Sequence, residues 1–311
     1  MKKRNQHYVF RAYLKPWSKN EKIYCLRDGK VFFSNLEGVA CERFFYKLEE
    51  LTPREIELID QAVIRSSREP TKTYLRQFLA LYSLAPKMKR HFASGAEPTF
   101  MSALDELIVN FGEDYHEQIE NSLLTFLNSM LAGNAEFYLD SKQAAKFLYA
   151  LSVQYTRTKQ VREAALSQIG TTFNDCDTRR VWSALSHIMA MKIGESLYID
   201  RQRFSLVLID NDTDTPFITA DQPIINLHAT FTGKPPDRLE FFYPLSPQRA
   251  MLLVEASSRI SDQPISAVSV NSYNVRMIQN SHEQVFSNSE EYLASVRHLV
   301  CSKPGDQRIR T

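Results

Sequence analysis

The sequence predicts an α+β fold with an N-terminal β-hairpin region, a large helical middle, and C-terminal antiparallel strands followed by helices. Three observations predict it: an Asp-Gly turn between apolar runs near Asp28, helical periodicity over 52–199, and strand-like segments after Ile199. No repeat and no long linker divides the chain. We therefore expect one composite domain: β-rich over 1–50, helical over 51–200, β then α over 201–301, with a mobile polar tail over 302–311.

The N-terminal region contains the hairpin. Residues 22–26 and 30–33 are apolar runs on either side of Arg27-Asp28-Gly29, and Asp-Gly in that setting is the strongest short hairpin signal. The segment 7–14, which runs up to Pro16, fits either a strand or a short helix.

The helical middle is expected to begin at Thr52-Pro53-Arg54-Glu55. Threonine suits the N-cap, proline suits the first turn, and Glu55 completes a capping box. Breaks are expected at Pro70, Pro86, Gly95–Pro98, Gly133-Asn134 and Gly170. Two apolar stripes at helical spacing predict faces that pack on a core: Leu104, Leu107, Ile108 and Phe111, and then Leu123, Leu124, Leu127 and Met130.

The C-terminal third returns to strands. Strands are expected at 203–209, 216–219, 240–243 and 250–254, with Pro244-Leu245-Ser246-Pro247 joining the last two. Helices are expected over 268–286 and 290–300.

Composition excludes several classes of protein. With 43% hydrophobic and 24% charged residues in 311, the chain is not disordered, and its 9 glycines argue against a fold built on Gly-rich phosphate loops. The isolated cysteines Cys25, Cys41, Cys176 and Cys301 predict free thiols, because none forms a CxxC pair. The basic Met1–Arg4 is followed by polar residues, and no apolar run reaches the ~18 residues of a membrane helix. We therefore expect a cytoplasmic protein without a membrane partner.

Several short motifs occur in a consistent order along the chain. They are His7-Tyr8-Val9 with Tyr13-Leu14, Gln154-Tyr155-Thr156-Arg157-Thr158, Phe217-Ile218-Thr219-Ala220-Asp221-Gln222-Pro223, Tyr243-Pro244-Leu245-Ser246-Pro247, and a helix around Asn274. Together they make the chain resemble domain of unknown function family 4238. Phe10 stands where the family usually has proline and Ala220 where serine is common, so the chain looks like a divergent member. The resemblance implies a shared fold and no particular activity.

Gln154 is predicted to be a buried polar residue. On one continuous helix it would share an apolar stripe with Phe147, Leu151, Thr158, Val161 and Ala165. An unpaired buried amide costs roughly 1–3 kcal/mol, so Gln154 must have a partner. Arg157 lies at the edge of the same face, where its planar fork suits a carboxylate or a phosphate. The pair either ties the helix to the β layer or belongs to a site.

Asp221 and His7 are the other candidates for chemistry. Asp221 follows a strand, where sites are often built, but an aspartate before X-Pro also organises turns, and Asp262-Gln263-Pro264 recurs in a plain loop. His7 titrates near neutral pH, and Tyr8 and Tyr13 can supply hydroxyl donors, but a histidine near a terminus is often a packing residue.

Two functional hypotheses follow. The first is a hydrolase acting on nucleic acid or a phosphate ester: His7 moves protons, Arg157 stabilises the transferred charge, and Asp221 orients a base or holds Mg²⁺ or Mn²⁺, with Tyr8, Tyr13, Gln154 and Asn274 in support. A role in bacterial defence or toxicity would be compatible with it. The second is a non-enzymatic module that binds protein or nucleic acid and whose motif residues are structural.

Two further patterns leave alternatives open. Glu113-x-x-His116 has the spacing of carboxylate-bridged metal bundles but occurs once, where such bundles need two copies. Residues 61–90 carry seven basic groups against Glu69, and residues 91–120 carry seven acidic groups. The basic stretch, with Tyr74, Phe78 and Tyr82 interleaved, is either a nucleic-acid surface or a helical segment that faces its acidic neighbour.

Overall fold

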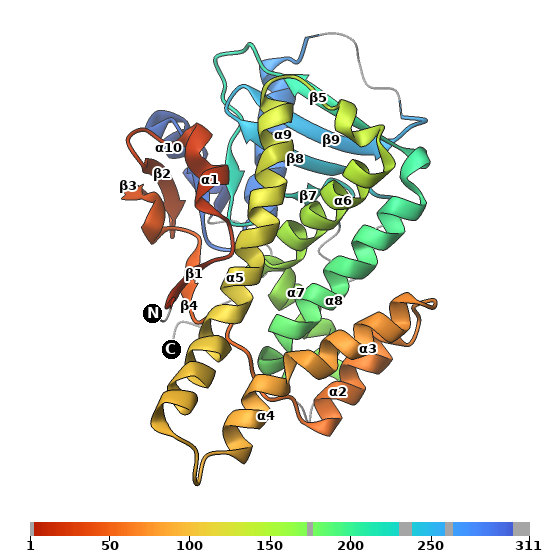
Figure 1. Ribbon diagram of the computed structural model, residues 1–311. Helices are drawn as coiled ribbons and strands as arrows, with labels where there is room; N and C mark the ends of the chain where they lie inside the picture. The colour runs from red at the N-terminus through yellow and green to blue at the C-terminus, as the bar shows by residue number, and fades with distance from the viewer. Residues whose placement is uncertain (1–2, 173–176, 230–237, 259–263, 301–311) are drawn as a thin grey trace.

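The computed structural model of the chain describes residues 3–172, 177–229, 238–258 and 264–300. It confirms the α+β class and the order of strands, helical middle and strands with helices (Figure 1). The predicted tail over 302–311, Cys176 and Cys301 lie outside the described residues. Within them, no helix is both long and apolar enough to cross a membrane.

Three antiparallel sheets form the β part. Sheet A pairs β1 (Asn5–His7) with β4 (Cys41–Arg43). Sheet B has the order β3 (Lys30–Asn35), β2 (Lys22–Arg27), β10 (Val285–Ser287) and β6 (Thr219–Ala220). Sheet C has the order β5 (Phe204–Asp210), β9 (Arg249–Glu255), β8 (Phe241–Ser246) and β7 (Ile225–Asn226). Sheet B therefore joins strands from both ends of the chain.

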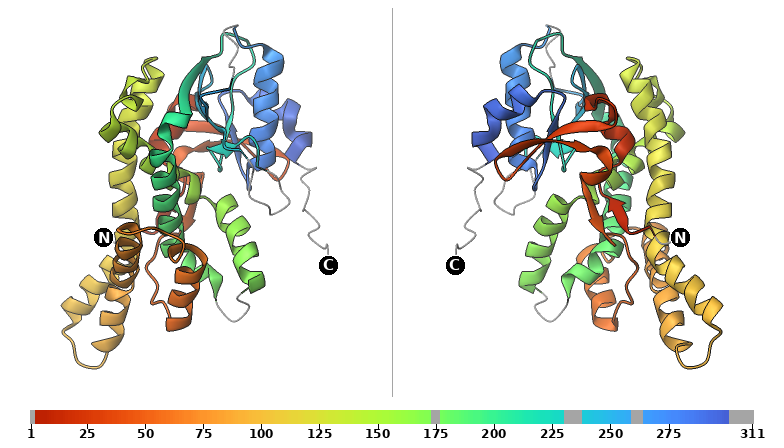
Figure 2. Two further views of the ribbon diagram at one scale, coloured as in Figure 1. Left: turned by 90° about the vertical axis from the view of Figure 1, so that its right-hand side faces the viewer. Right: turned by 90° about the vertical axis from the view of Figure 1, so that its left-hand side faces the viewer.

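The helices surround these sheets and extend beyond them. The middle of the chain forms α2 (Pro53–Ile59), α3 (Thr71–Tyr82), α4 (Leu84–His91), α5 (Pro98–Leu131), α6 (Ser141–Thr156), α7 (Lys159–Thr172) and α8 (Thr178–Ile199). Short α1 (Arg11–Leu14) precedes them, and α9 (Ala267–Asn280) and α10 (Glu290–Val300) follow. Short helical turns are η1 (Lys15–Trp17), η2 (Leu36–Gly38), the π-helical η3 (Asp60–Ile64), η4 (Glu136–Tyr138) and η5 (Arg201–Arg203). Helix α5 runs most of the length of the molecule, and its N-terminal end projects with α4 away from the sheets (Figures 1 and 2).

The buried apolar side chains form three clusters. The first joins the N-terminal segment to α5, α6 and sheet C. The second lies among α2, α3, α4 and α8. The third lies between sheets B and C and is covered by α9 and α10. The motif residues lie where these clusters meet.

The local signals at the N-terminal end are confirmed. Strands β2 and β3 form the predicted hairpin, and Asp28 and Gly29 adopt the positive φ angles, 51° and 71°, that its tight turn requires. The Thr52 hydroxyl accepts from the Glu55 N–H and the Glu55 carboxylate accepts from the Thr52 N–H, so the capping box is complete. The segment 7–14 contains the end of β1 and then helix α1, so the predicted strand and the predicted short helix each occur in one part of it.

Two predicted helix breaks are wrong. Pro86 lies in the first turn of α4, where proline is tolerated, and the break falls at Ser83. Helix α7 continues through Gly170, because a single glycine lowers helix stability without ending a helix. Conversely, the helix expected to carry Gln154 and Ala165 together is broken, since α6 ends at Thr156 and α7 begins at Lys159.

Two C-terminal predictions are also corrected. Helix α9 ends at Asn280 and not at 286, and Val285–Ser287 instead forms β10. Pro244 lies inside β8 and not in a connection. It is tolerated there because β7 pairs only with Phe241 and Phe242, so no neighbouring strand needs an N–H from residue 244 on that side. Helix α10 has the predicted bounds.

Only part of the apolar stripe predicted for the first half of α5 is buried. Leu104 and Ile108 are buried, whereas Leu107 and Phe111 are 46% and 42% exposed. In the second half, Leu123, Leu127 and Met130 are buried as expected.

Candidate functional site

Hydrogen bonds of three of the motifs join the N-terminal segment, the α6–α7 junction, the end of β6 and the loop 281–284. Gln154 connects two of these segments. Its Nε2 donates to the carbonyl oxygen of Tyr8 at 3.2 Å, and its Oε1 accepts from Arg157 Nη2 at 2.7 Å. The buried amide therefore has partners on both sides.

Arg157 is 1% exposed and is held by its neighbours. Its Nη1 donates to Glu120 Oε1 at 2.6 Å, and its guanidinium lies 5.7 Å from the centroid of the Phe10 ring. Phe10 thus covers this cation. The carboxylate that Arg157 was expected to meet is supplied by α5.

The face of α5 toward Arg157 is polar and buried. Burial and the neighbouring Glu120 raise the pKa of the Glu113 carboxyl to about 7. His116, one turn further along, lies 4.0 Å from the Tyr46 ring and 4.7 Å from the His187 ring, measured between centroids. Burial lowers the pKa of His187 to about 4 and that of His116 well below its usual value, so both rings are neutral.

Several atoms of this interior cluster have no hydrogen-bond partner among the described residues. They are Oε2 of Glu113, both ring nitrogens of His116, Nδ1 of His187, Nε of Arg157 and the hydroxyl of Tyr243. The described residues contain no group of three or more His, Cys, Asp or Glu side chains placed to hold a metal ion, so Glu113-x-x-His116 is not part of one.

Asp221 is buried and anchors a loop. Its Oδ1 accepts from the His282 N–H at 2.7 Å, and its Oδ2 accepts from the N–H groups of Glu283 at 2.7 Å and Gln284 at 3.0 Å. Its own N–H donates to the carbonyl of Gln284. A carboxylate in such a nest of backbone amides holds the turn that leads from α9 into β10.

The residue after Asp221 ties this loop to the helical layer. Gln222 Oε1 accepts from the Thr158 hydroxyl, while its Nε2 donates to the carbonyl of Ile224 at 2.6 Å. The Gln154–Thr158 motif at the end of α6 and the Phe217–Pro223 motif around β6 are thereby in direct contact.

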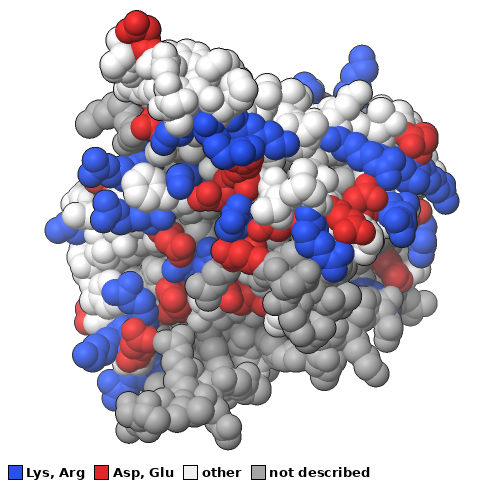
Figure 3. All heavy atoms as spheres, turned by 90° about the horizontal axis from the view of Figure 1, so that it is seen from below, with Lys and Arg blue, Asp and Glu red and all other residues white. Residues whose placement is uncertain are grey.

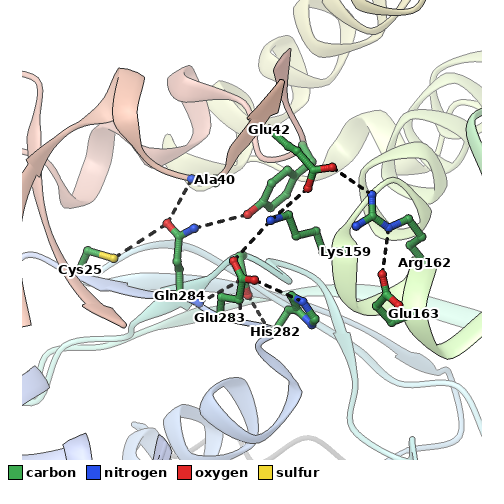
Figure 4. Close-up of polar contacts among 11 residues, drawn as sticks. Cys25, Ala40, Glu42, Lys159, Arg162, Glu163, His282, Glu283 and Gln284 are labelled. Carbon is green, nitrogen blue, oxygen red and sulfur yellow. Dashed lines mark hydrogen bonds and ion pairs between the residues drawn. The ribbon is translucent and has the colours of Figure 1, made fainter. Parts of the chain in front are cut away.

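Tyr8 lies between the same segments. Gln284 Nε2 donates to its hydroxyl at 3.4 Å, and Gln284 Oε1 accepts from the N–H of Ala40 at 3.2 Å (Figure 4). Burial, followed by the charge of Asp221, raises the pKa of the Tyr8 phenol. Lys159 lies 5.4 Å from the centroid of the Tyr8 ring and covers its outer side.

A rim of charged side chains surrounds Tyr8. Lys159 Nζ lies 3.1 Å from Glu42 Oε2 and 3.4 Å from Glu283 Oε2, so it joins sheet A to the 281–284 loop (Figure 4). Arg162 pairs with Glu42 at 3.5 Å and with Glu163 at 3.2 Å. Sequence reasoning missed these residues, although Lys159 and Arg162 directly follow the Gln154–Thr158 motif.

His7 directly precedes Tyr8 and is the last residue of β1. Burial and the charge of Arg11 lower the pKa of its ring, Arg157 adds to this effect, and its Nε2 is buried without a partner among the described residues. Among the described residues no hydrogen bond or ring contact joins His7 to Arg157, and the carboxylate of Asp221 is directed to the backbone of the 281–284 loop.

Tyr13 and Asn274 both bond the segment 216–219, which leads into and includes the start of β6. The Tyr13 hydroxyl donates to the carbonyl of Pro244 at 2.8 Å and bonds Thr219 Oγ1 at 2.6 Å. Asn274 Oδ1 accepts from the N–H of Ile218 at 3.1 Å, and its Nδ2 donates to the carbonyl of Pro216 at 2.8 Å and to the Tyr292 hydroxyl.

The basic stretch 61–90 forms ion pairs, one of which joins it to the acidic stretch 91–120. Lys89 Nζ lies 2.5 Å from Asp105 Oδ1, which joins α4 to α5. Arg76 pairs with Asp60 at 2.8 Å and Arg90 with Glu50 at 2.9 Å. Seen from below, basic and acidic side chains alternate over the described part of this face (Figure 3). The Lys89–Asp105 pair is the contact expected if the two stretches face each other, whereas Arg76 and Arg90 pair with acidic residues that precede both stretches.

Comparison with known proteins gives one match. A family model described as "Protein of unknown function (DUF4238)" matches residues 5–291. No curated protein and no solved structure matches the chain.

Proposed function

Since the chain belongs to the DUF4238 family of proteins of unknown function, we propose a function from its structure: a non-enzymatic module that binds another protein. The contacts of the motif residues support this proposal. Asp221, Gln154 and Asn274 direct their polar atoms to backbone groups of distant segments. Groups engaged in this way hold segments together and are not free to bind a substrate.

The observation that carries the proposal is the position of the exposed apolar side chains. Seven of the twelve large hydrophobic side chains that are exposed in the described residues lie between Tyr74 and Phe111. This stretch, α3, α4 and the start of α5, is named the arm here. Its exposed members are Tyr74, Leu81, Leu84, Phe92, Phe100, Leu107 and Phe111.

The arm is shaped for contact with another molecule. Its α4–α5 end projects from the body (Figures 1 and 2), and Phe92 and Phe100 pack edge to face across its tip at 5.7 Å between ring centroids. Leu81 is 68% exposed on the outer side of α3. Gathered apolar side chains with charged neighbours are typical of protein–protein interfaces.

The test compares three forms of the protein as bait. Wild type, Leu81→Ser with Leu107→Ser, and the control Val268→Ser, which changes an apolar residue on α9 that is 80% exposed, are used to isolate partners from cells of the source organism. A partner purified separately should then bind wild type and Val268→Ser with equal Kd and the arm variant at least about tenfold more weakly. Equal binding by all three would refute the proposal for the arm.

A second candidate is the hydrolase acting on nucleic acid or a phosphate ester. The charge of Arg157, which affects the pKa of both His7 and Glu113, favours it together with the pKa of Glu113 near 7, since catalytic groups have pKa values near the working pH. Arg157 would stabilise transferred charge, and a divalent metal such as Mg²⁺ or Mn²⁺ would be a cofactor of such a reaction. A defence or toxin role would follow from cleavage of cellular nucleic acid.

The hydrolase is tested on total RNA, tRNA and plasmid DNA with Mg²⁺, Mn²⁺ or EDTA. Wild type is compared with His7→Ala, Asp221→Ala and Glu113→Gln, each verified as folded by circular dichroism. Cleavage that His7→Ala and Glu113→Gln lose would establish the enzyme. If no preparation cleaves any substrate, the nuclease is refuted and the binding module remains the proposed function.

A further inference from the structure

Strand β5 is an edge strand of sheet C, and half of its backbone groups point away from the sheet. It bonds to β9 with Phe204 opposite Glu255. Just outside the strand and in the same register, the Arg203 carbonyl accepts from Ala256 N–H at 2.7 Å and Asn211 N–H donates to Gln248 at 2.8 Å. Because bonded pairs alternate in an antiparallel ladder, the odd-numbered residues bond β9 and the even-numbered ones face outward.

The outward groups of Leu206 and Leu208 have no partner elsewhere in the described chain. No backbone hydrogen bond outside the β5–β9 ladder involves them among the residues that the structure describes. All residues of β5 before Asp210 are half-buried, whereas the interior of β9 is buried, as expected for a strand at the rim of a sheet. In Figure 1, β5 lies at the outer side of sheet C, at the end of the molecule opposite the arm.

Strand β5 lacks the sequence features that usually prevent an exposed edge strand from pairing with another strand. Residues 204–209 contain neither lysine nor proline, and their pairing with β9 has no bulge. Exposed edges in monomeric proteins are usually blunted by such features, because free N–H and C=O groups otherwise pair with another strand. A straight, apolar and unprotected edge is therefore a surface for strand addition.

The charges at the two ends of β5 identify the added strand. Arg201 and Arg203 precede it, and Asp210, Asp212 and Asp214 follow or end it. Asp212 and Asp214 are exposed and form no ion pair within the described residues, and the Arg203 side chain is 71% exposed, with Asp200 at 3.9 Å. A copy of β5 running antiparallel would bring the acidic end of one strand to the basic end of the other.

We propose that β5 pairs antiparallel with β5 of a second copy across a two-fold axis, so that sheet C continues through both molecules. Outward residues must meet outward residues, and a two-fold axis beside Val207 meets this condition by placing Leu206 opposite Leu208 of the other copy, each exchanging both backbone hydrogen bonds. In this register the basic end of one strand, at Arg203, faces the residues at the acidic end of the other, from Asp210 to Asp214. A groove of ≈490 Å³ beside the first half of β5, lined in part by Leu139 and Arg201, leaves room for the approach.

This face is separate from the arm, so the proposal holds whether or not the arm binds a partner. Leu139, 85% exposed at the groove, would lie at the rim of the contact. The same register predicts a two-fold symmetric dimer and no open chain, because each copy has one such edge in sheet C.

The first test measures the mass of the full chain in solution by sedimentation at about 100 µM, a concentration at which a weak dimer is populated. Leu206→Pro removes the outward N–H and Leu206→Ala keeps it, so the two variants separate backbone pairing from side-chain packing. We expect wild type and Leu206→Ala to be dimers and Leu206→Pro a monomer, with a Kd raised at least about tenfold. A monomeric wild type, or equal Kd values for the two variants, overturns the proposal.

The second test does not depend on the folding of Leu206→Pro. Arg203→Asp should weaken the dimer about tenfold, and adding Asp212→Arg in the same chain should restore it, since a negative charge at one strand end then faces a positive charge at the other. Failure of the second substitution to restore the dimer refutes the proposed antiparallel pairing of the strand ends. A dimer lost in the arm variant and kept in Arg203→Asp would place the contact on the arm and also overturn the proposal.

Discussion

Single residues of the motifs explain why the chain retains polar groups in its core. Asp221, Gln154 and Asn274 are each nearly inaccessible, and each holds segments that are far apart in the sequence, such as Gln154 with Tyr8. A buried polar group without a partner costs about 1–3 kcal/mol, so each of these residues stabilises only the arrangement in which its partners are present. These buried polar residues therefore help to determine which segments pack together.

Asp221→Ala is expected to lower the free energy of unfolding by about 3 kcal/mol, because three backbone N–H groups of the 281–284 loop lose their acceptor at once. Urea denaturation followed by circular dichroism measures the change. Asp214→Ala, at an exposed position, is the control and should change stability by less than about 0.5 kcal/mol. Equal midpoints for the two variants would contradict the anchoring role.

Glu113 is expected to make stability depend on pH. Its pKa is raised to about 7, so the folded state binds the proton more tightly than the unfolded state, and the free energy of unfolding falls as pH rises from about 4.5 to about 7. Glu113→Gln removes this loss. The variant should be more stable than wild type by about 2 kcal/mol at pH 8 and nearly equal to it at pH 4.5.

Denaturation of wild type and Glu113→Gln at both pH values measures this difference, with Glu291→Gln on α10 as control. The neutral His187 acts in the opposite direction, since its pKa of about 4 means that stability present above pH 6.5 is lost as pH falls. Because both proteins contain His187, that effect cancels in the comparison. A difference that does not change between pH 4.5 and pH 8 would contradict the role of Glu113.

At the level of elements, α5 connects the arm to the body and fits closely against the N-terminal segment. A Cβ at Gly112 would lie 2.5 Å from the carbonyl oxygen of Tyr46, closer than atoms can approach. The Gln6 side chain bonds the Val109 carbonyl and the Tyr46 N–H at the same crossing. This close contact of backbones is what brings Tyr46 over His116.

Gly112→Ala is therefore expected to destabilise the protein by about 2 kcal/mol or more, although alanine is the better helix former by about 1 kcal/mol. Thermal unfolding measures the change. Gly95→Ala is the control, because a Cβ there meets no atom within 4 Å. If Gly112→Ala raised the Tm, helix propensity would outweigh the clash and the crossing would be looser than described.

At the level of the whole molecule, sheet B takes its strands from three distant parts of the chain. Val285 pairs with Leu26 on one side and with Ala220 on the other. The first fifty residues also supply part of the cluster that covers α5 and α6. Such interleaving favours a single cooperative unit, and the single composite domain remains a prediction until unfolding is measured.

The two tryptophans report on this question. Trp17 lies in the first hydrophobic cluster, with its Nε1 donating to the carbonyl of Phe217 at 2.8 Å, and Trp182 lies in the second. Trp17→Phe and Trp182→Phe each leave one reporter. If the chain is one composite domain, the tryptophan fluorescence of each variant should change at the same urea midpoint as the circular dichroism of that variant. Separate midpoints would divide the helical half from the sheets.

The sequence by itself determined the features that depend on neighbouring residues. The Asp28-Gly29 turn, the Thr52 capping box and the bounds of α10 follow from backbone preferences and periodicity over a few residues. The burial and pairing of Gln154 also followed, because an amide within an apolar stripe has to be satisfied wherever the helix packs.

Only the tertiary structure decided which distant groups meet. Strand β10 has three residues, too few for a periodic signal, and is a strand because β2 and β6 lie on both sides of it. Leu107 and Phe111 match a core pattern but face outward, because the projecting end of α5 is covered on one side. Glu120 as the partner of Arg157, and backbone amides as the partners of Asp221, depend on contacts between segments remote in sequence, which no local pattern records.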